Sequence, residues 1–511
     1  MTVAEATPEM DTVADRSDRA FIGHPKGLGY LAAVEWCERF SYYSMQNLLG
    51  LYLVGYLLLP AQFGEVIGLG WLQQWRYDGA EGQQLQSAIF GDYSSLVYLT
   101  PILGGFIADR WLGRRAALVA GAVIMSLGHI MMAFEGAFVF ALLTLIIGVG
   151  LFKGNIAGQI GELYKPGDLR RAMAFQIFYL MIQLSVIIAP FISGTLGEKV
   201  AWHYGFGCAG VVMVLGLLIY LKASPWLPPD NRPQAGTGST ALKVMASAAG
   251  MLVFTIAIVA VLSLPGSLSL FLAGAVVLAA SFALLRGLDR TDRLRVLAVI
   301  ALVPILAVSL LTNQQIFNVY LIWADEHFQL TFFGFTAPTT WLTAIDAAAS
   351  LTMLLAVIGF WKWRADRTGR EPDELGKMII GSVFSVAGGL CLAMAAATQG
   401  DGKIGLFWPL MFHLLNSIGF AHILPVALAL FTRLAPRQLN ATIVGIHYLA
   451  FFLAAQIVGR IGALYSTWDT VSFWLLHAAT AVAGLIAFWL FKGLLAKRLF
   501  GDGKPEDAAL A

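Results

Sequence analysis

The chain has 511 residues, of which 58% are hydrophobic and 13% are charged, and its formal net charge is +2. Together with a mean hydropathy of +0.73, these values exclude an ordinary soluble globular protein and favour a membrane protein that crosses the bilayer many times. A net charge this close to zero gives no indication of a nucleic-acid partner.

The first 26 residues are polar and acidic, and they contain no basic segment followed by an apolar one. This pattern is not typical of a cleaved signal peptide, so residues 1–26 are predicted to form a cytoplasmic tail. Cys37, Cys208 and Cys391 lie in apolar segments without metal-ligand spacing. We interpret them as small buried hydrophobic residues, and we predict no metal site.

Fourteen apolar segments are each long enough to cross a membrane as a helix. Their expected limits are 28–58, 84–109, 115–135, 138–163, 171–196, 203–223, 243–263, 268–286, 294–324, 340–363, 376–397, 404–432, 439–465 and 471–495. Segment 59–83 is interrupted by glycine and polar residues, so we predict an outer loop with an interfacial turn there.

Lysine and arginine gather after alternate predicted spans, whereas the loops between these positions are poor in positive charge. The clustered basic residues are Arg110, Arg114, Arg115, Lys165, Arg170, Arg171, Arg286, Arg290, Arg293, Arg295, Lys362, Arg364, Arg367, Arg370, Arg433, Arg437, Lys492, Lys497 and Arg498. The positive-inside rule therefore predicts an even number of spans, with both termini in the cytoplasm. We expect a multi-pass protein of the inner (plasma) membrane.

Two features divide the chain into parts. Residues 223–240 are rich in proline, glycine and polar side chains, which is typical of a linker, and the next two spans form a tight hairpin with almost no polar residue. Without this apparently lipid-facing hairpin, six spans remain on each side, as in transporters built from two related halves. The predicted parts are an N-terminal six-helix bundle at 27–223, a linker with an inserted helical hairpin at 224–290, a C-terminal six-helix bundle at 291–500 and a cytoplasmic tail at 501–511.

The loop after the second span reads GGFIADRWLGRR, from Gly104 to Arg115. Its glycines allow helices to approach closely, and its acidic and basic residues can form a charge network across the short loop. The stretch resembles the loop signature of the major facilitator superfamily. This resemblance implies an all-α integral membrane protein with the major facilitator fold, here two six-helix bundles plus the inserted two-helix hairpin, or 14 transmembrane helices.

Five polar residues in the first span share one helical face, because they follow one another at i, i+3, i+4, i+7 and i+11. They are Glu35, Glu38, Arg39, Tyr42 and Gln46. Charges inside a membrane face a bundle interior or an aqueous cavity and need partners, and Lys153 in GLFKGN would bring the local charge to zero. The cluster is either a structural ion network or a proton-coupling site that also offers cations to an anionic substrate.

The sequence shows no nucleotide-binding loop, no cluster of metal ligands and no catalytic Ser/His/Asp arrangement. We therefore expect neither an enzyme nor a cofactor, and an ion gradient has to supply the energy for any transport.

Several stretches resemble the proton-dependent oligopeptide transporters (POT/PTR) of the major facilitator superfamily over roughly residues 25 to 500. EWCERFSYYS is similar to the ExxERFxYY motif of that family, and GVGLFKGNI is similar to its fourth-helix lysine segment. The chain also carries RRAMAFQIFYLMIQLS, AWHYGFG and LALFTRLAPRQLNATIVG. The resemblance implies a proton-linked cluster of Glu35, Glu38 and Arg39 with Lys153 as its partner. It further implies that Arg39, Lys153, Tyr42 and Tyr43 contact the peptide.

The second half departs from the family pattern at three positions. Gln314 stands where the family usually has a glutamate that receives the peptide amino group, Phe420 replaces a second glutamate, and His447 replaces a tryptophan. With Asn318, Gln314 belongs to the amide-rich stretch TNQQIFN, whose side chains either bind a neutral polar group or pack helices. These departures put ordinary recognition of zwitterionic peptides in question.

Other polar residues in predicted spans have two readings each. Asp346 is either a carboxylate that replaces the lost glutamate, as an amine acceptor or second proton site, or an acid at an outer helix end. His413, His422 and His447 are either packing residues or groups that titrate near neutral pH, and Asp92 is either cavity-facing or interfacial. The predicted substrate-binding residues are Arg39, Tyr42, Tyr43, Lys153, Gln314, Asn318, Asp346 and His447.

The predicted function is proton-coupled symport of di- or tripeptides or peptide-like solutes by alternating access. The alternatives are a family member that imports or exports a non-peptide substrate, such as a modified amino acid or small organic anion, and a membrane sensor that does not transport. The expected partners are a small-molecule substrate, protons and membrane lipid. The sequence leaves the oligomeric state open.

Overall fold

The computed structural model describes residues 18–165, 168–229, 239–436 and 439–500. Most of the predicted N-terminal tail, the middle of the predicted linker, Arg437 and the C-terminal tail at 501–511 lie outside the described residues.

Long helices account for most of the described chain, and fourteen of them have 18 residues or more. They are α1 (Lys26–Tyr52), α4 (Gly82–Ile107), α5 (Arg114–Met131), α6 (Phe138–Glu162), α7 (Arg170–Ala189), α9 (Trp202–Ala223), α10 (Thr240–Leu262), α11 (Gly266–Leu285), α12 (Arg290–Ser309), α15 (Trp341–Thr368), α16 (Glu374–Thr398), α17 (Phe407–Leu434), α18 (Asn440–Gly462) and α19 (Thr470–Phe500). Eleven helices are long and apolar enough to span a membrane, or twelve if the bent pair at 290–317 counts as one span. The eleven do not include α1 and α4, because the buried charges of α1 and Asp92 of α4 lower the mean hydropathy of these two helices. The predicted all-α membrane fold is confirmed, and the helices are compatible with fourteen spans.

Short elements connect the long helices. They are η1 (Leu53–Leu57), α2 (Pro60–Phe63), α3 (Leu69–Tyr77), η2 (Ala108–Leu112), η3 (Glu135–Ala137), η4 (Pro190–Gly194), α8 (Thr195–Lys199), η5 (Ser224–Trp226), α13 (Leu311–Gln314), η6 (Gln315–Phe317), α14 (Val319–His327), β1 (Thr331–Phe332), β2 (Phe335–Thr336) and η8 (Ala463–Ser466). The two strands pair antiparallel in a small hairpin. In the segment predicted as an outer loop, α2 and α3 are too short to span a membrane.

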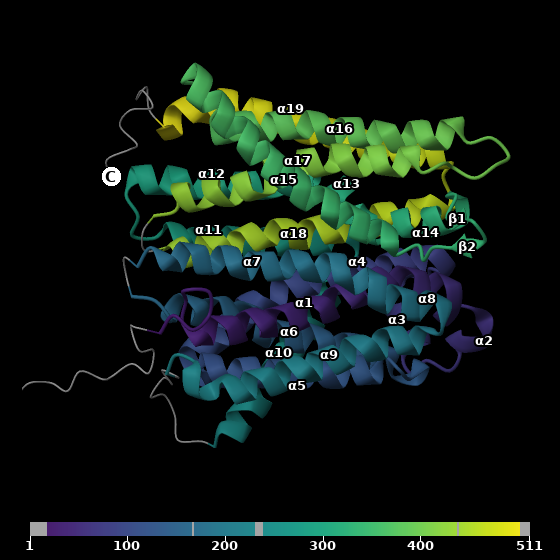
Figure 1. The fold of residues 1–511 in the computed structure, drawn as a ribbon, viewed down its shortest axis with the longest axis horizontal. Coiled ribbons are helices and arrows are strands. Elements are labelled where there is room, and N and C mark those ends of the chain that lie inside the picture. Colours follow the sequence, from purple (N-terminus) through teal and green to yellow (C-terminus); the bar gives the residue numbers. More distant parts are fainter. Residues whose placement is uncertain (1–17, 166–167, 230–238, 437–438, 501–511) are drawn as a thin grey trace, which may run out of the picture.

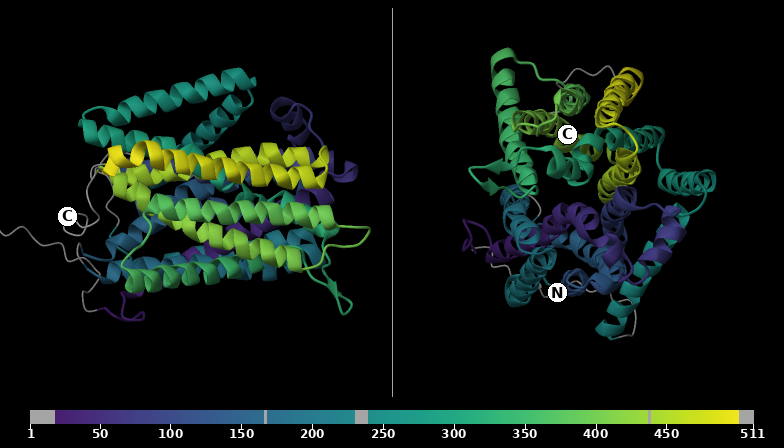
Figure 2. Two further views of the ribbon diagram at one scale, coloured as in Figure 1. Left: turned by 90° about the horizontal axis from the view of Figure 1, so that it is seen from above. Right: turned by 90° about the vertical axis from the view of Figure 1, so that its right-hand side faces the viewer.

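The helices form two bundles that lie against each other, with α1 to α9 in one and α12 to α19 in the other (Figure 1). Each bundle has its own apolar core, with Phe152 and Phe206 fully buried in the first and Phe431 and Phe488 in the second. The helices α10 and α11 stand to one side of the bundles (Figure 2), and Met251 of α10 is buried against α5 and α6. The residue limits of these parts stay a prediction.

The two ends of the molecule differ in charge. At one end α1 begins and α4 ends, and the helix termini there carry the arginines and lysines that the sequence clusters after alternate spans. We call this the basic end, and it lies on the left in Figure 1. The other end, which holds α3, α8 and the β-hairpin, is called the opposite end.

Close helix packing explains the glycines of the GGFIADRWLGRR loop. A Cβ at Gly104 would lie 1.9 Å from the carbonyl oxygen of Gly150, so only glycine permits this contact of α4 and α6. Gly113 has a φ of +84°, which a side chain rarely adopts. In the loop, Arg114 forms ion pairs with Asp109 and Glu162. The charge network predicted for this loop is therefore present at Arg114.

The ninth predicted span is broken rather than continuous. The axes of α12 and of the following turns at 311–317 differ by 50°, and the chain then continues as α14. The bend lies at Leu310, directly before the amide-rich stretch TNQQIFN, and a second interruption follows at Asn318, the last residue of that stretch, whose side chains can hydrogen-bond in place of a regular helix. Non-helical backbone at membrane depth is tolerated where protein covers it or a polar site uses it.

Candidate functional site

Three charged side chains of α1 form a buried cluster. The Nε atom of Arg39 lies 3.2 Å from Oε1 of Glu35 and also donates to Oε2 of Glu38. All three residues are at most 4% exposed. The second oxygen of each glutamate and Nη2 of Arg39 have no partner among the described residues. One guanidinium thus serves two acids in a place where an unpaired charge costs several kcal/mol, so the cluster responds to any added or removed charge.

Lys153 reaches the same place from α6. Its ammonium lies 5.3 Å from the ring centre of Tyr42 and 4.8 Å from that of Tyr98, and Arg39 lies 5.1 Å from the same Tyr42 ring. No carboxylate of the described residues lies within ion-pair distance of Lys153. Two cations therefore lie beside one aromatic ring, an arrangement that suits a bound carboxylate better than either cation alone.

Aromatic contacts place this cluster where the bundles meet. The Tyr43 ring lies 6.5 Å from Phe317 of the C-terminal bundle, and the Tyr98 ring stacks on Phe451 at 4.9 Å. Tyr448, on the neighbouring turn of α18, is 39% exposed although it sits in a membrane-spanning helix. The predicted residues of the first half are thus gathered at one interface.

The second half faces this interface with amides. Gln314 and Gln315 are buried, and neither amide atom of Gln315 has a partner among the described residues. Asn318 is fully buried, and its Oδ1 accepts a hydrogen bond of 2.8 Å from Nε2 of Gln86. In the first bundle, Asn47 of α1 likewise has no hydrogen-bond partner among the described residues for its amide atoms. In the C-terminal bundle, neutral donors and acceptors therefore stand in place of charged groups.

Asp346 and the histidines have different surroundings. Oδ1 of Asp346 lies 2.8 Å from Nδ1 of His413, within the C-terminal bundle. His422 is engaged on both ring nitrogens, by the carbonyl of Ile418 and by the indole of Trp361, which is typical of a packing residue. The ring of His447 lies between Phe431 and Phe451, at 5.2 Å and 5.7 Å.

Hydrogen bonds join the two bundles in the half of the molecule nearer the opposite end. Between α4 and the C-terminal bundle, the bonds are those of Gln86 and Ser87 with Asn318, of Gln83 with the Gly462 carbonyl, and of Gln456 with Asp92 and Ser95. A Cβ at Gly91 would lie 2.7 Å from the Cα atom of Gly459, so the backbones touch there. The described residues of the basic half show no hydrogen bond or ion pair between the bundles.

Glu198 of α8 closes the same end at a second place. Its carboxylate accepts hydrogen bonds from the backbone N–H groups of Thr339 and Thr340 and from the Thr340 hydroxyl, at 2.6–3.0 Å. These groups form the start of α15, where a helix favours negative charge. The opposite end is therefore closed by polar contacts that can be broken and remade.

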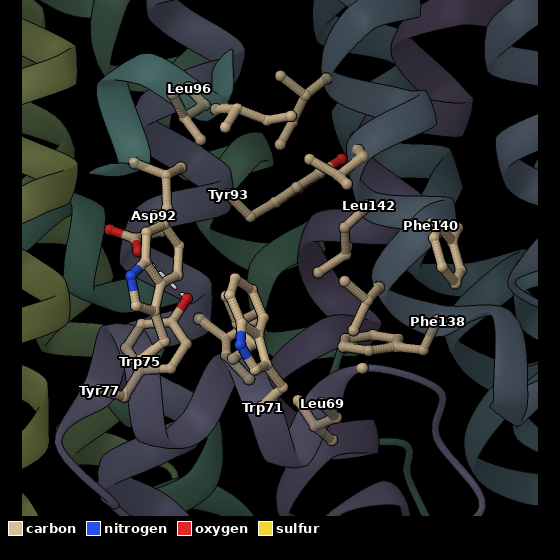
Figure 3. A pocket seen from close by; sticks show the side chains of 18 of the residues that line it. Leu69, Trp71, Trp75, Tyr77, Asp92, Tyr93, Leu96, Phe138, Phe140 and Leu142 are labelled. Carbon is tan, nitrogen blue, oxygen red and sulfur yellow. Dashed lines mark hydrogen bonds between the residues drawn. The ribbon is translucent and has the colours of Figure 1, made fainter. Parts of the chain in front are cut away.

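Asp92 is neither isolated nor simply cavity-facing. It accepts two hydrogen bonds from Arg76 and one each from Tyr77 and Gln456. It lies at the edge of an apolar cavity of about 310 Å³ between α3, α4, α6 and α10, lined by side chains such as Trp71 and Phe138 (Figure 3). This cavity lies on the flank of the N-terminal bundle, away from Arg39 and Lys153, and its apolar walls do not suit a peptide.

Sequence reasoning missed several residues of this interface. Tyr98, Tyr448, Glu198 and Gln456 were not predicted as site residues. Tyr98 lies six residues after the flagged Asp92 in α4, which is less than two helical turns and places it on another face, so it carried no local signal. The others acquire their contacts from helices far away in sequence.

Comparison with known proteins finds relatives over nearly the whole chain. The model of the POT family matches residues 115–475. The peptide transporter YePEPT of Yersinia enterocolitica is 30% identical over 87% of this chain and 88% of its own length. A di-/tripeptide transporter of Lactococcus lactis is 27% identical over 96% of this chain and 99% of its own. The crystal structure of a mutant peptide transporter POT in complex with alafosfalin has a TM-score of 0.77 at 26% identity, covering 95% of this chain and 97% of that one.

Proposed function

This chain belongs to the POT family, and from this membership we propose that it is a proton-coupled symporter of di- and tripeptides or peptide-like solutes. Members of the family are transporters, so the protein is a multi-pass membrane transporter and not an enzyme. The observation that carries the proposal is the pair of cations, Arg39 and Lys153, on one tyrosine ring beside two buried glutamates.

Substrate binding follows from this arrangement. A peptide carboxylate between Arg39 and Lys153 forms charge-assisted hydrogen bonds, while Tyr42 and Tyr43 provide aromatic walls. The relatives named peptide transporters and the structure with alafosfalin support this substrate class. Gln314, Asn318 and His447 would meet the rest of the solute from the other bundle.

Proton coupling uses the same arginine. When a substrate carboxylate binds Arg39, Glu35 and Glu38 lose part of their counter-charge, and protonation of one of them becomes favourable. By linkage, a protonated glutamate frees Arg39 for the substrate. Proton binding and substrate binding therefore strengthen each other, as symport requires.

Alternating access needs an end that opens and an end that closes. The hydrogen bonds of Gln86, Glu198 and Gln456 support a closed opposite end, and the lack of such bonds among the described residues of the basic half supports access from there. We assign the basic end to the cytoplasm of the inner membrane, with both termini there, because lysine and arginine stay on the cytoplasmic side.

A second candidate is transport of a solute without a free amino group. The observation that favours it is the replacement of the expected acidic group by Gln314, since an amide complements an ammonium group poorly. Small organic anions or modified amino acids would then be carried by the same two cations, inward or outward.

Proteoliposomes with an imposed pH gradient, alkaline inside, test the proposal. Di- and tripeptides and single-charge carboxylates are offered in parallel, with vesicles lacking a gradient as the control. We expect peptides to accumulate only with the gradient. Accumulation of carboxylates alone would support the second candidate, and binding without any accumulation would identify a sensor.

A further inference from the structure

A chain of three polar side chains runs through the C-terminal bundle, apart from the Arg39 cluster. The Tyr320 hydroxyl lies 2.8 Å from Nε2 of His413, and Nδ1 of His413 lies 2.8 Å from Oδ1 of Asp346. Tyr320 comes from α14, Asp346 from α15 and His413 from α17. Tyr320 and His413 are completely buried, and Asp346 is 7% exposed. Three helices thus contribute one hydrogen-bonded series.

The surroundings of this series are apolar and almost uncharged. Phe328, Phe412 and Trp474 pack around the Tyr320 ring at 5.3–6.4 Å. Two further titratable groups lie nearby: the Cys391 thiol of α16, which interacts electrostatically with Tyr320, and His477 of α19, whose ring contacts Trp474 and whose Nδ1 is bonded to the Phe473 carbonyl. Glu198 meets α15 further toward the opposite end, at Thr340. None of these groups places a second negative charge beside His413, so Asp346 is the group that balances the positive charge of a protonated His413.

This arrangement accommodates two protonation states. With neutral His413, Nδ1–H donates to Asp346 and Nε2 accepts from the Tyr320 hydroxyl. With protonated His413, both ring N–H groups donate, and the tyrosine oxygen accepts while Asp346 balances the charge. Because only the tyrosine hydroxyl has to turn, a proton can enter and leave without a change in packing. A histidine in apolar surroundings without a carboxylate has no such second state.

The position of Asp346 ties the series to closure of the opposite end. Thr343 lies three residues before Asp346, on the same face of α15, and Thr339 and Thr340 form the turn that leads into this helix. The backbone N–H groups of Thr339 and Thr340 donate to Glu198 of the other bundle. Asp346 is 7% exposed, whereas Tyr320 and His413 are completely buried, so Asp346 offers the route by which a proton reaches the series.

We propose that Tyr320, His413 and Asp346 form a proton-binding site of the C-terminal bundle, which loads and releases one proton in each transport cycle. The site supplies the titratable group that this bundle lacks at Gln314, and it acts in addition to Glu35 and Glu38. The inference rests on the proposed proton-coupled function, but occupancy of the site by a proton is a property of the folded protein itself.

Proton stoichiometry tests the cycle. In proteoliposomes with the membrane potential held at zero, His413→Gln and Asp346→Asn should each couple one proton fewer than the wild type. Under a gradient of one pH unit, the steady-state accumulation should then fall by about tenfold. His129→Gln is the matched control, because His129 is 1% exposed in α5 and has no carboxylate partner among the described residues. An unchanged accumulation ratio in both variants would overturn the proposal.

A direct titration keeps the test independent of transport. Solid-state NMR of protein labelled with ¹⁵N-histidine in lipid, assigned by difference from His413→Gln, reports the charge of the His413 ring. We expect this ring to change from imidazolium to neutral as the pH is raised over the range in which the protein stays folded, and to lose that change in Asp346→Asn. Tyr320→Phe should alter the Nε2 signal while keeping the ring packing. If the wild-type protein carried no peptide but His413 titrated, the transport proposal alone would fail. A His413 ring with one constant charge over this range would overturn the proton site.

Discussion

The two bundles bring different chemistry to the interface between them. The N-terminal bundle presents Arg39, paired with two buried glutamates, and Lys153, and both cations lie over the Tyr42 ring. The C-terminal bundle has buried amides, of which Asn318 bonds across the interface, and its buried Asp346 is paired with His413. The difference supports the proposed division of work, in which the first bundle binds the substrate anion and the second sets selectivity.

Loss of one cation should produce the largest effect on affinity. Lys153→Gln removes a charge-assisted contact of about 1.5–3 kcal/mol, so the concentration of peptide needed for half-maximal uptake should rise roughly 10- to 150-fold. Lys153→Arg is the matched control and should retain most of the affinity. An unchanged affinity in Lys153→Gln would show that the carboxylate binds elsewhere, and the first bundle would lose its assigned role.

The second-largest effect should come from a substitution that separates the two bundles at the opposite end. Gly91→Val places a side chain against the Gly459 backbone, and overpacking costs about 1–3 kcal/mol in the closed state only. The open state should gain roughly 5- to 150-fold in population, and uptake should fall accordingly. Gly105→Val on the same helix is the control, since a Cβ there meets no atom within 4 Å. Equal uptake by both variants would contradict the described closure.

A restored acid should make the second bundle resemble the first. Gln314→Glu places a carboxylate where this chain has an amide, and it should raise the preference for a free over an acetylated amino terminus by about tenfold, or ~1.4 kcal/mol. Competition assays with the two forms measure this ratio, with Gln314→Asn as the uncharged control. The role of Gln314 in selectivity would be refuted by a ratio that stays at the wild-type value in Gln314→Glu.

Among the proteins compared for selectivity, the wild type should discriminate least between free and acetylated amino termini. Because Gln314 stands in the place of an acid and Asp346 is paired with His413, an N-acetylated dipeptide should compete within about threefold of its free-amine form, a difference below ~1 kcal/mol. A loss of competition of about 100-fold, or about 2.7 kcal/mol, would reveal a carboxylate that receives the amine. For Asp346 to be that carboxylate, it would have to give up its hydrogen bond to His413.

The parts that local pattern encodes could be predicted from the sequence. Apolar length marks the spans, and the spacing of Glu35, Glu38 and Arg39 places them on one face, because helical periodicity links neighbours in sequence and space. Pairs between helices have no such signature. His413 and Asp346 are 67 residues apart, and Glu198 and Thr340 are 142 apart. Their meeting depends on how whole helices pack, so the sequence left Asp346 with two readings and gave no sign of Glu198.

The broken ninth span shows a related limit. Residues 294–324 have enough apolar length for one continuous helix, but the helix bends by 50° at Leu310 and is interrupted again at Asn318, whose amide bonds to Gln86 of the other bundle. A hydropathy window averages such an amide with its apolar neighbours, whereas the fold uses it as a hydrogen-bonding group at the interface.

Glu38→Gln gives the most direct test of the claim that the charged cluster of the first bundle couples protons to the substrate. The substitution keeps the shape of the side chain but fixes it in an uncharged state, so it cannot take up and release a proton. In proteoliposomes under a gradient of one pH unit, the variant should lose the accumulation that this cluster drives, about tenfold for the one proton that it couples, while counterflow exchange, which needs no net proton movement, should continue. A Glu38→Gln protein that accumulates peptide as strongly as the wild type would contradict this account.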